Sequence, residues 1–198
     1  MTKIKLCGLK RECDIAYANE FIPEYIGFVF AKKSKRYITP KQAMILRKQL
    51  NPQIIPVGVF VNETPGAIAD LVNQNIIEIV QLHGREDKEY IQTLRSYVDC
   101  PIIQAFQINS KEAVEAANNS SADYILLDSS GGSGECFDWS LLQKLNRPYF
   151  LAGGLSCENV KHAITMLQPY AVDASSSLET DGYKDKEKMA AFVRAVRE

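Results

Sequence analysis

Short apolar runs alternate with amphipathic segments from one end of the chain to the other. The runs are rich in Val, Ile, Tyr and Phe, a composition that favours buried β-strands. We expect eight strands, at residues 4–7, 25–30, 54–60, 77–82, 102–106, 124–128, 149–151 and 171–174. The order of the segments predicts a strand–helix unit that repeats along the chain.

The segments between the strands carry helix signals. Residues able to cap a helix N-terminus, two of them followed by proline, are Thr39, Thr64, Ser110, Asp138 and Ser156. Apolar side chains then recur at helical spacing, most clearly at Val160, Ala163, Ile164 and Leu167 and at Met189, Phe192, Val193 and Val196. Each of these stripes should face a sheet.

The number of units decides between two folds. A doubly wound open sheet also alternates strands and helices, but it commonly has five or six strands. Dividing 198 residues by eight gives about 25 residues per unit, which is the small end of the (β/α)₈ range. Eight evenly spaced units favour closure, so we predict a single (β/α)₈ TIM barrel domain over residues 1–198.

Composition and charge narrow the function classes. Lys plus Arg (23) nearly balances Asp plus Glu (24), so no overall field attracts nucleic acid or a membrane, and an anion must be bound locally. The five cysteines are scattered without Cys-x-x-Cys spacing, which indicates reduced thiols and no metal site. The sequence shows no apolar signal region, no membrane-spanning segment and no extended apolar patch. We therefore expect a cytoplasmic monomer.

Candidate chemistry follows from the fold, because reactive groups in such barrels lie at the C-terminal ends of strands and in the loops that follow. The residues at these positions are Cys7, Arg36, His83, Gln104, Asp128, Gly131-Gly132-Ser133-Gly134, Gly153-Gly154, Asp173 and Ser175-Ser176. Glycines let backbone N–H groups approach an anion, and the loops after the seventh and eighth strands are the common phosphate location. A glycine pair alone is more often a simple turn. Three small, polar loops at one end favour a phosphate site at Gly131, Gly132, Gly134, Gly153, Gly154, Ser175 and Ser176.

Two residues can transfer protons. An unpaired cysteine in a strand is usually core filling, but Cys7 ends the first strand, where its sulfur can face the barrel mouth and act as a base. Asp128 ends the apolar run 124–128, where it is either a loop hydrogen bonder or a partly desolvated general acid. Placed on the first and sixth strands, the two side chains could flank one substrate.

Three further residues have candidate binding roles. Arg36 belongs to a basic run that is ordinarily a solvated loop, but beside the barrel mouth its guanidinium could hold a carboxylate. His83 is a structural hydrogen bonder or a substrate-facing group, and no metal-ligand partner stands near it in sequence. Asp173 is a loop organiser or an acceptor for a sugar hydroxyl.

The ordered motifs resemble the phosphoribosylanthranilate isomerases of tryptophan biosynthesis almost end to end. The resemblance is carried by residues 4–9, 27–30 with 34–38, 80–84, 126–128, 131–134 with 137–139, 151–155 and 172–176. It implies an Amadori rearrangement of N-(5-phosphoribosyl)anthranilate to its 1-deoxyribulose phosphate isomer, without metal or organic cofactor. It further implies that Asp128 is the general acid, Cys7 the general base and Arg36 the clamp for the anthranilate carboxylate.

Two positions depart from the family pattern, and two alternatives compete with it. Lys35 stands where proline is common, and Ser177 stands where glycine usually follows the serine pair.

The first alternative function is another phosphosugar barrel enzyme, such as an epimerase or a lyase. The second is a catalytically silent barrel that binds a phosphate metabolite, but it would not need an acid and a base facing each other.

Overall fold

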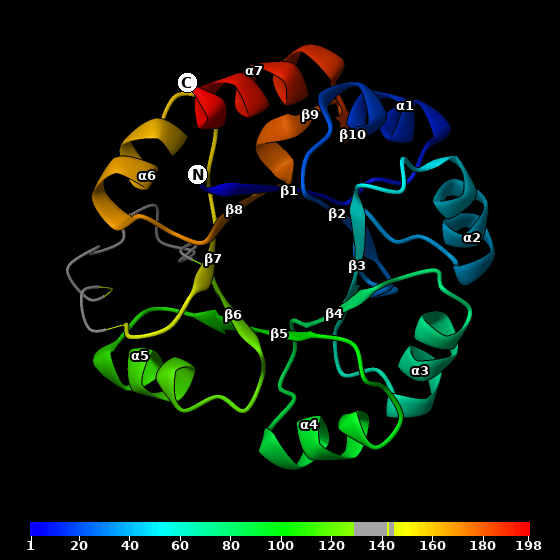
Figure 1. The fold of residues 1–198 in the computed structure, drawn as a ribbon, viewed down its shortest axis with the longest axis vertical. Helices are drawn as coiled ribbons and strands as arrows, with labels where there is room; N and C mark the ends of the chain where they lie inside the picture. Colours follow the sequence, from blue (N-terminus) through cyan, green and yellow to red (C-terminus); the bar gives the residue numbers. More distant parts are fainter. Residues whose placement is uncertain (129–141, 143–144) are drawn as a thin grey trace.

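Eight parallel strands form a closed barrel in the chain order β1 to β8, which confirms the predicted fold (Figure 1). The protein is described by a computed structural model that covers residues 1–128, 142 and 145–198. The strands are β1 (Lys3–Cys7), β2 (Tyr25–Val29), β3 (Ile55–Phe60), β4 (Ile79–Leu82), β5 (Ile102–Gln107), β6 (Tyr124–Asp128), β7 (Tyr149–Ala152) and β8 (Ala171–Ala174). Their ends differ from the predicted ends by at most two residues.

Helices surround the barrel (Figure 1). They are α1 (Glu12–Phe21), α2 (Pro40–Gln49), α3 (Pro65–Asn73), α4 (Lys88–Arg95), α5 (Lys111–Asn118), α6 (Val160–Leu167) and α7 (Lys186–Arg197). Between β8 and α7 the chain forms a 3₁₀ turn, η2 (Ser176–Leu178), and a small antiparallel hairpin of β9 (Glu179–Thr180) and β10 (Tyr183–Lys184).

The predicted caps at Thr39, Thr64 and Ser110 are confirmed, because each side chain accepts a hydrogen bond from the first turn of its helix. The predicted helix start at Ser156 is wrong. Ser156 begins a turn in which its carbonyl accepts from Val160 N at 3.0 Å, and α6 starts only at Val160. The cap predicted at Asp138 lies outside the described residues.

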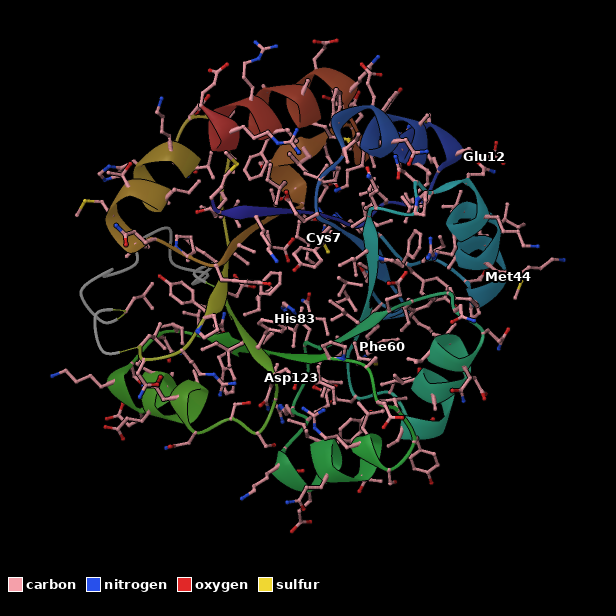
Figure 2. All side chains as sticks on the ribbon, viewed as in Figure 1. Cys7, Glu12, Met44, Phe60, His83 and Asp123 are labelled. Carbon is pink, nitrogen blue, oxygen red and sulfur yellow. The ribbon has the colours of Figure 1, made fainter. Side chains whose placement is uncertain are left out.

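Alternation along each strand divides the core into two layers. In β1, Ile4 and Leu6 pack outward into the large apolar cluster beneath the helices, while Lys5 and Cys7 point into the barrel. Both faces of every strand are therefore covered, which explains the nearly continuous apolar runs in the sequence. Figure 2 shows Cys7 and His83 near the barrel axis and Glu12 and Met44 on the outer ring.

Aromatic side chains close the N-terminal end of the barrel. Tyr25 Oη lies 3.2 Å from Tyr170 Oη, and Tyr124 stacks on Tyr170 with 5.2 Å between the ring centroids. Lys3 Nζ donates to Tyr170 Oη at 2.7 Å. Since these groups fill that end, the space for a ligand lies at the other end, where the strands terminate.

None of the helices in the described ranges combines the length and the apolar character needed to cross a membrane.

Candidate active site

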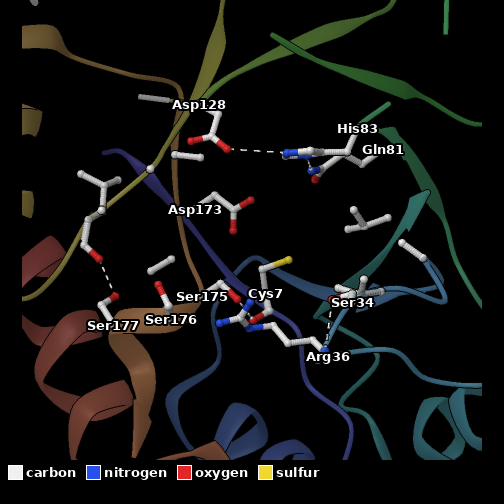
Figure 3. Close-up of a pocket in the computed structure, with 18 of the residues that line it drawn as sticks. Cys7, Ser34, Arg36, Gln81, His83, Asp128, Asp173, Ser175, Ser176 and Ser177 are labelled. Carbon is white, nitrogen blue, oxygen red and sulfur yellow. Dashed lines mark hydrogen bonds and ion pairs between the residues drawn. The ribbon is translucent and has the colours of Figure 1, made fainter. Parts of the chain in front are cut away.

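A cavity of about 350 Å³ opens at the C-terminal end of the barrel (Figure 3). Every candidate site residue within the described ranges, Gln104 excepted, lines it: Cys7, Arg36, His83, Asp128, Gly153, Gly154, Asp173, Ser175 and Ser176. The candidates Gly131, Gly132 and Gly134 lie outside the described residues. With Val59 of β3, seven barrel strands or the loops after them contribute to this one cavity, as the fold requires of a TIM-barrel site.

Gln104 is not part of this cavity, and its prediction as a rim residue is wrong. Because β5 extends to Gln107, Gln104 lies in the middle of the strand instead of at its end. Its amide donates to Glu86 O at 2.7 Å and accepts from Ser120 Oγ at 2.6 Å. These bonds tie together the loops outside the barrel.

Cys7 presents its sulfur to the cavity from the last residue of β1 (Figure 3). The opposing residue in β2 is Gly27, and its lack of a side chain makes room for the thiol. Burial raises the pKa of the Cys7 thiol, and the positive charge of Lys5 opposes that rise only in part. The environment at rest therefore favours the thiol form of Cys7 over the thiolate.

Gly27→Ala should lower kcat by about 10- to 100-fold, because an added Cβ would lie 2.6 Å from Cys7 Sγ and 3.1 Å from Cys7 Cα. We expect a loss of about 1–3 kcal/mol in the free energy of unfolding as well. Steady-state kinetics and denaturant titration measure the two effects. Gly66→Ala is the matched control, since nothing lies within 4 Å of its Cβ position. Wild-type kcat in Gly27→Ala would show that the thiol position does not matter.

Asp128 forms a group with His83 and Gln81. His83 Nε2 lies 3.6 Å from Asp128 Oδ2, as the dashed line in Figure 3 marks. The Gln81 amide nitrogen lies 3.0 Å from His83 Nδ1, the ring nitrogen on the side away from Asp128, and so fixes the orientation of the imidazole. Gln81 is buried, whereas Asp128 is about one-quarter exposed to the cavity, with 23% of its side chain accessible. The carboxyl group of Asp128 can therefore reach a ligand while His83 supports it.

Arg36 is held by the hairpin that follows β8. Its Nε and Nη2 donate to Glu179 Oε1 and Oε2 at 2.6 and 2.8 Å. Lys184 Nζ donates to Glu179 Oε1 at 2.6 Å and to Ser175 O at 2.9 Å. Burial alone would raise the pKa of Glu179, but hydrogen bonds from Arg36 and Lys184 outweigh burial and lower that pKa. The result is two cations around one carboxylate, with a net positive charge at this side of the cavity.

Small residues form the cavity wall after β7 and β8. Gly153 and Gly154 have φ values of +93° and +66°, a left-handed conformation that glycine adopts without strain. Ser175 Oγ donates to Cys7 O at 2.9 Å, which joins this wall to the C-terminal end of β1. Ser177, where the family usually has glycine, donates to Leu155 O and so joins the two loops. Glycine and serine residues thus make up this part of the cavity lining.

Sequence reasoning missed four residues of this site: Lys5, Gln81, Glu179 and Lys184. Lys5 and Gln81 carried a usable signal, because each is a polar strand residue two positions before a candidate that ends or directly follows the same strand, and so shares its inward face. Glu179 and Lys184 carried none, since their partners Arg36 and Ser175 are brought to them by the folded chain.

Within residues 1–128, 142 and 145–198, no group of three or more His, Cys, Asp and Glu side chains is placed to hold a metal ion.

Comparison with known proteins identifies the family. The family model for N-(5′-phosphoribosyl)anthranilate (PRA) isomerase matches residues 4–195. The enzyme of that name from Acetivibrio thermocellus is 42% identical over 212 residues, with 100% of this chain and 97% of the relative covered.

Solved structures agree with the family model. One is a phosphoribosyl anthranilate isomerase in complex with reduced 1-(o-carboxyphenylamino)-1-deoxyribulose 5-phosphate; it is 36% identical, with a TM-score of 0.88 over 100% of this chain and 99% of that one. Another is a monomeric variant of the dimeric isomerase from Thermotoga maritima, 35% identical with a TM-score of 0.87 over the same shares. The chain therefore belongs to the N-(5′-phosphoribosyl)anthranilate isomerase family of tryptophan biosynthesis.

Proposed function

We propose that this chain converts N-(5′-phosphoribosyl)anthranilate to 1-(2-carboxyphenylamino)-1-deoxyribulose 5-phosphate, with Asp128 as general acid and Cys7 as general base. The observation that carries the assignment is that both side chains line one cavity, from strands β6 and β1, which two other strands separate in the closed barrel. An acid and a base held apart in this way can act on neighbouring atoms of one pentose.

The first step opens the ring. Asp128 donates its proton to the furanose ring oxygen, and the bond between that oxygen and C1′ breaks. The anthranilate nitrogen supplies its lone pair to C1′, so a Schiff base cation forms and Asp128 becomes a carboxylate. His83, 3.6 Å from Asp128, is placed to orient this carboxyl group in both states.

The second step moves a proton from carbon. The Cys7 thiolate removes the proton from C2′, and the released electron pair forms the C1′–C2′ double bond and neutralises the nitrogen. The enolamine then tautomerises: the C2′ hydroxyl loses a proton and C1′ gains one, which gives the ketone. At the end Cys7 holds one proton and Asp128 has lost one, so release of the first to solvent and uptake of the second from solvent restore both groups. No oxidant, reductant or cofactor enters the sequence.

The two charged ends of the substrate fit the two polar walls of the cavity. Arg36 has five N–H donors, of which Glu179 engages two, so a fork of donors is left for the anthranilate carboxylate. Gly153, Gly154, Ser175 and Ser176 line the wall assigned to the phosphate.

Asp173 also lines the cavity, between the wall at Arg36 and the wall formed by the loops after β7 and β8. Among the described residues, its buried Oδ1 has no hydrogen-bond partner. A sugar hydroxyl that donates to this oxygen would satisfy it, which supports a substrate-binding role.

A fluorescence assay that follows consumption of phosphoribosylanthranilate by the purified protein tests the proposal. We expect loss of the signal and formation of the ketose product by mass spectrometry. Unchanged signal from a protein with a folded circular dichroism spectrum would favour a silent phosphate-binding barrel. Conversion of a different phosphosugar instead would favour another enzyme of the same fold.

The proposal takes residues 1–198 as one catalytic domain that acts as a monomer. The single domain is supported by α7, which follows the last barrel strand and packs against α1, α6 and β1. The monomer stays a prediction, and gel filtration measures it directly.

A further inference from the structure

Lys5 places a positive charge inside the barrel, directly below the cavity. It precedes Cys7 by two residues on β1, so both side chains point inward, and it pairs in register with Asp173 on β8. Lys5 is 0% exposed, and its Nζ lies 2.6 Å from Asp173 Oδ2. Cys7 lies two residues further along the same inward face of β1, so the positive charge of Lys5 also acts on the Cys7 side chain. The ammonium group is thus paired with a carboxylate and lies on the same inward face as the thiol.

Stability does not explain this ion pair. Taking two charges out of water costs about as much as their attraction returns, and apolar residues of similar volume are often as stable or more stable. Apart from Gln81 on β4 and Asp173 itself, the barrel interior at this depth is mainly apolar, with side chains such as Val57, Ile103 and Leu126. A lysine at this depth therefore calls for a reason that lies in the chemistry above it.

The charges around Cys7 identify that reason. Burial raises the pKa of the Cys7 thiol, and Lys5 is the strongest influence that lowers it. Asp173 raises the pKa and Lys184 lowers it, each less strongly than Lys5. Arg36, on the loop after β2, is the remaining cation that interacts with Cys7. Lys5 itself stays charged, because Asp173 and Cys7 together overcome its own burial and raise its pKa.

We propose that Lys5, held in place by Asp173, is a positioning residue that stabilises the thiolate form of Cys7. The inference rests on the proposed role of Cys7 as the general base. Burial makes the thiolate scarce, and an ammonium group two residues away on the same inward face of β1 restores part of it where the proton on C2′ must be removed. Asp173 keeps the ammonium in position through its Oδ2 oxygen.

The test is the pH dependence of Cys7 alkylation in the free enzyme. Iodoacetamide reacts with thiolates, and mass spectrometry of the Cys7 peptide separates this thiol from the others. We expect Lys5→Met to move the midpoint of the pH–rate curve to higher pH. Below that midpoint the alkylation rate should fall by about tenfold for each pH unit by which the midpoint moves. In Lys5→Met/Asp173→Asn the midpoint should stay above that of the wild type without exceeding that of the single variant, because the opposing charge is also removed.

Lys3→Met is the matched control. Lys3 is the inward lysine two residues earlier on β1, but it bonds Tyr170 at the closed end of the barrel, so its loss should leave the midpoint unchanged. If Lys5→Met does not fold because Asp173 is left buried and unpaired, the double variant, which carries neither charge, decides the question. A wild-type midpoint in the folded Lys5 variants would overturn the proposal. The readout needs no turnover, so it is independent of whether Cys7→Ala abolishes activity.

Discussion

Cys7→Ala should lower kcat by about 10²- to 10⁴-fold, the usual contribution of a positioned base, while the barrel stays folded. Alanine removes the only sulfur that the structure describes in the cavity lining and leaves C2′ without a base at this position. The backbone at residue 7 is held by its pairing with Gly27 on β2 and by the hydrogen bond from Ser175 Oγ to Cys7 O, which do not involve the thiol. KM should change little, because the carboxylate and phosphate walls are untouched.

Two further variants separate chemistry from packing in this prediction. Cys7→Ser keeps the size of the side chain but has a far weaker acid in place of the thiol, so we expect a loss of kcat close to that of alanine. Cys157→Ala removes an exposed thiol outside the cavity and should behave as the wild type. Near wild-type turnover in purified Cys7→Ala would refute the assignment of the base.

The eight strands and the rim of the cavity could be predicted because they depend on local pattern. A buried parallel strand reads as an apolar run, and the barrel rule then points to whatever polar residue ends it. Cys7, His83 and Asp128 were found in this way. The start of α6 was misplaced because Ser156 caps a turn with the same local chemistry as a helix start.

The electrostatics of the site could not be predicted, because they come from contacts between distant parts of the chain. Lys5 and Asp173 are separated by 168 positions, and Arg36 and Glu179 by 143. A basic run such as the one around Arg36 is ordinarily solvated, and only the folded hairpin shows that a carboxylate fixes its guanidinium. The sequence therefore identified most of the described side chains that meet at the rim, with Gln104 as the error, but not which ones set their charge.

Asp128→Asn should also lower kcat by about 10²- to 10⁴-fold, because the amide keeps the shape of the carboxyl group but cannot deliver an acidic proton to the ring oxygen. Ring opening would then depend on water, and the Schiff base would form slowly. The asparagine side chain keeps nearly the same position beside His83, which lies 3.6 Å from the Asp128 carboxylate. Substrate binding should therefore be less affected than turnover. Steady-state kinetics give kcat and KM separately, and circular dichroism reports the fold.

The control for this prediction lies one residue before the same strand. Asp123 accepts from Ile102 N at 2.7 Å and pairs with Arg95 at 2.8 Å, at the end of β6 away from the cavity. Asp123→Asn should weaken stability slightly and leave kcat unchanged, since surface ion pairs contribute about 0–1 kcal/mol. If Asp128→Asn kept wild-type kcat, or if both variants lost activity together, proton donation by Asp128 could not be the cause, and the acid would have to be sought elsewhere on the rim.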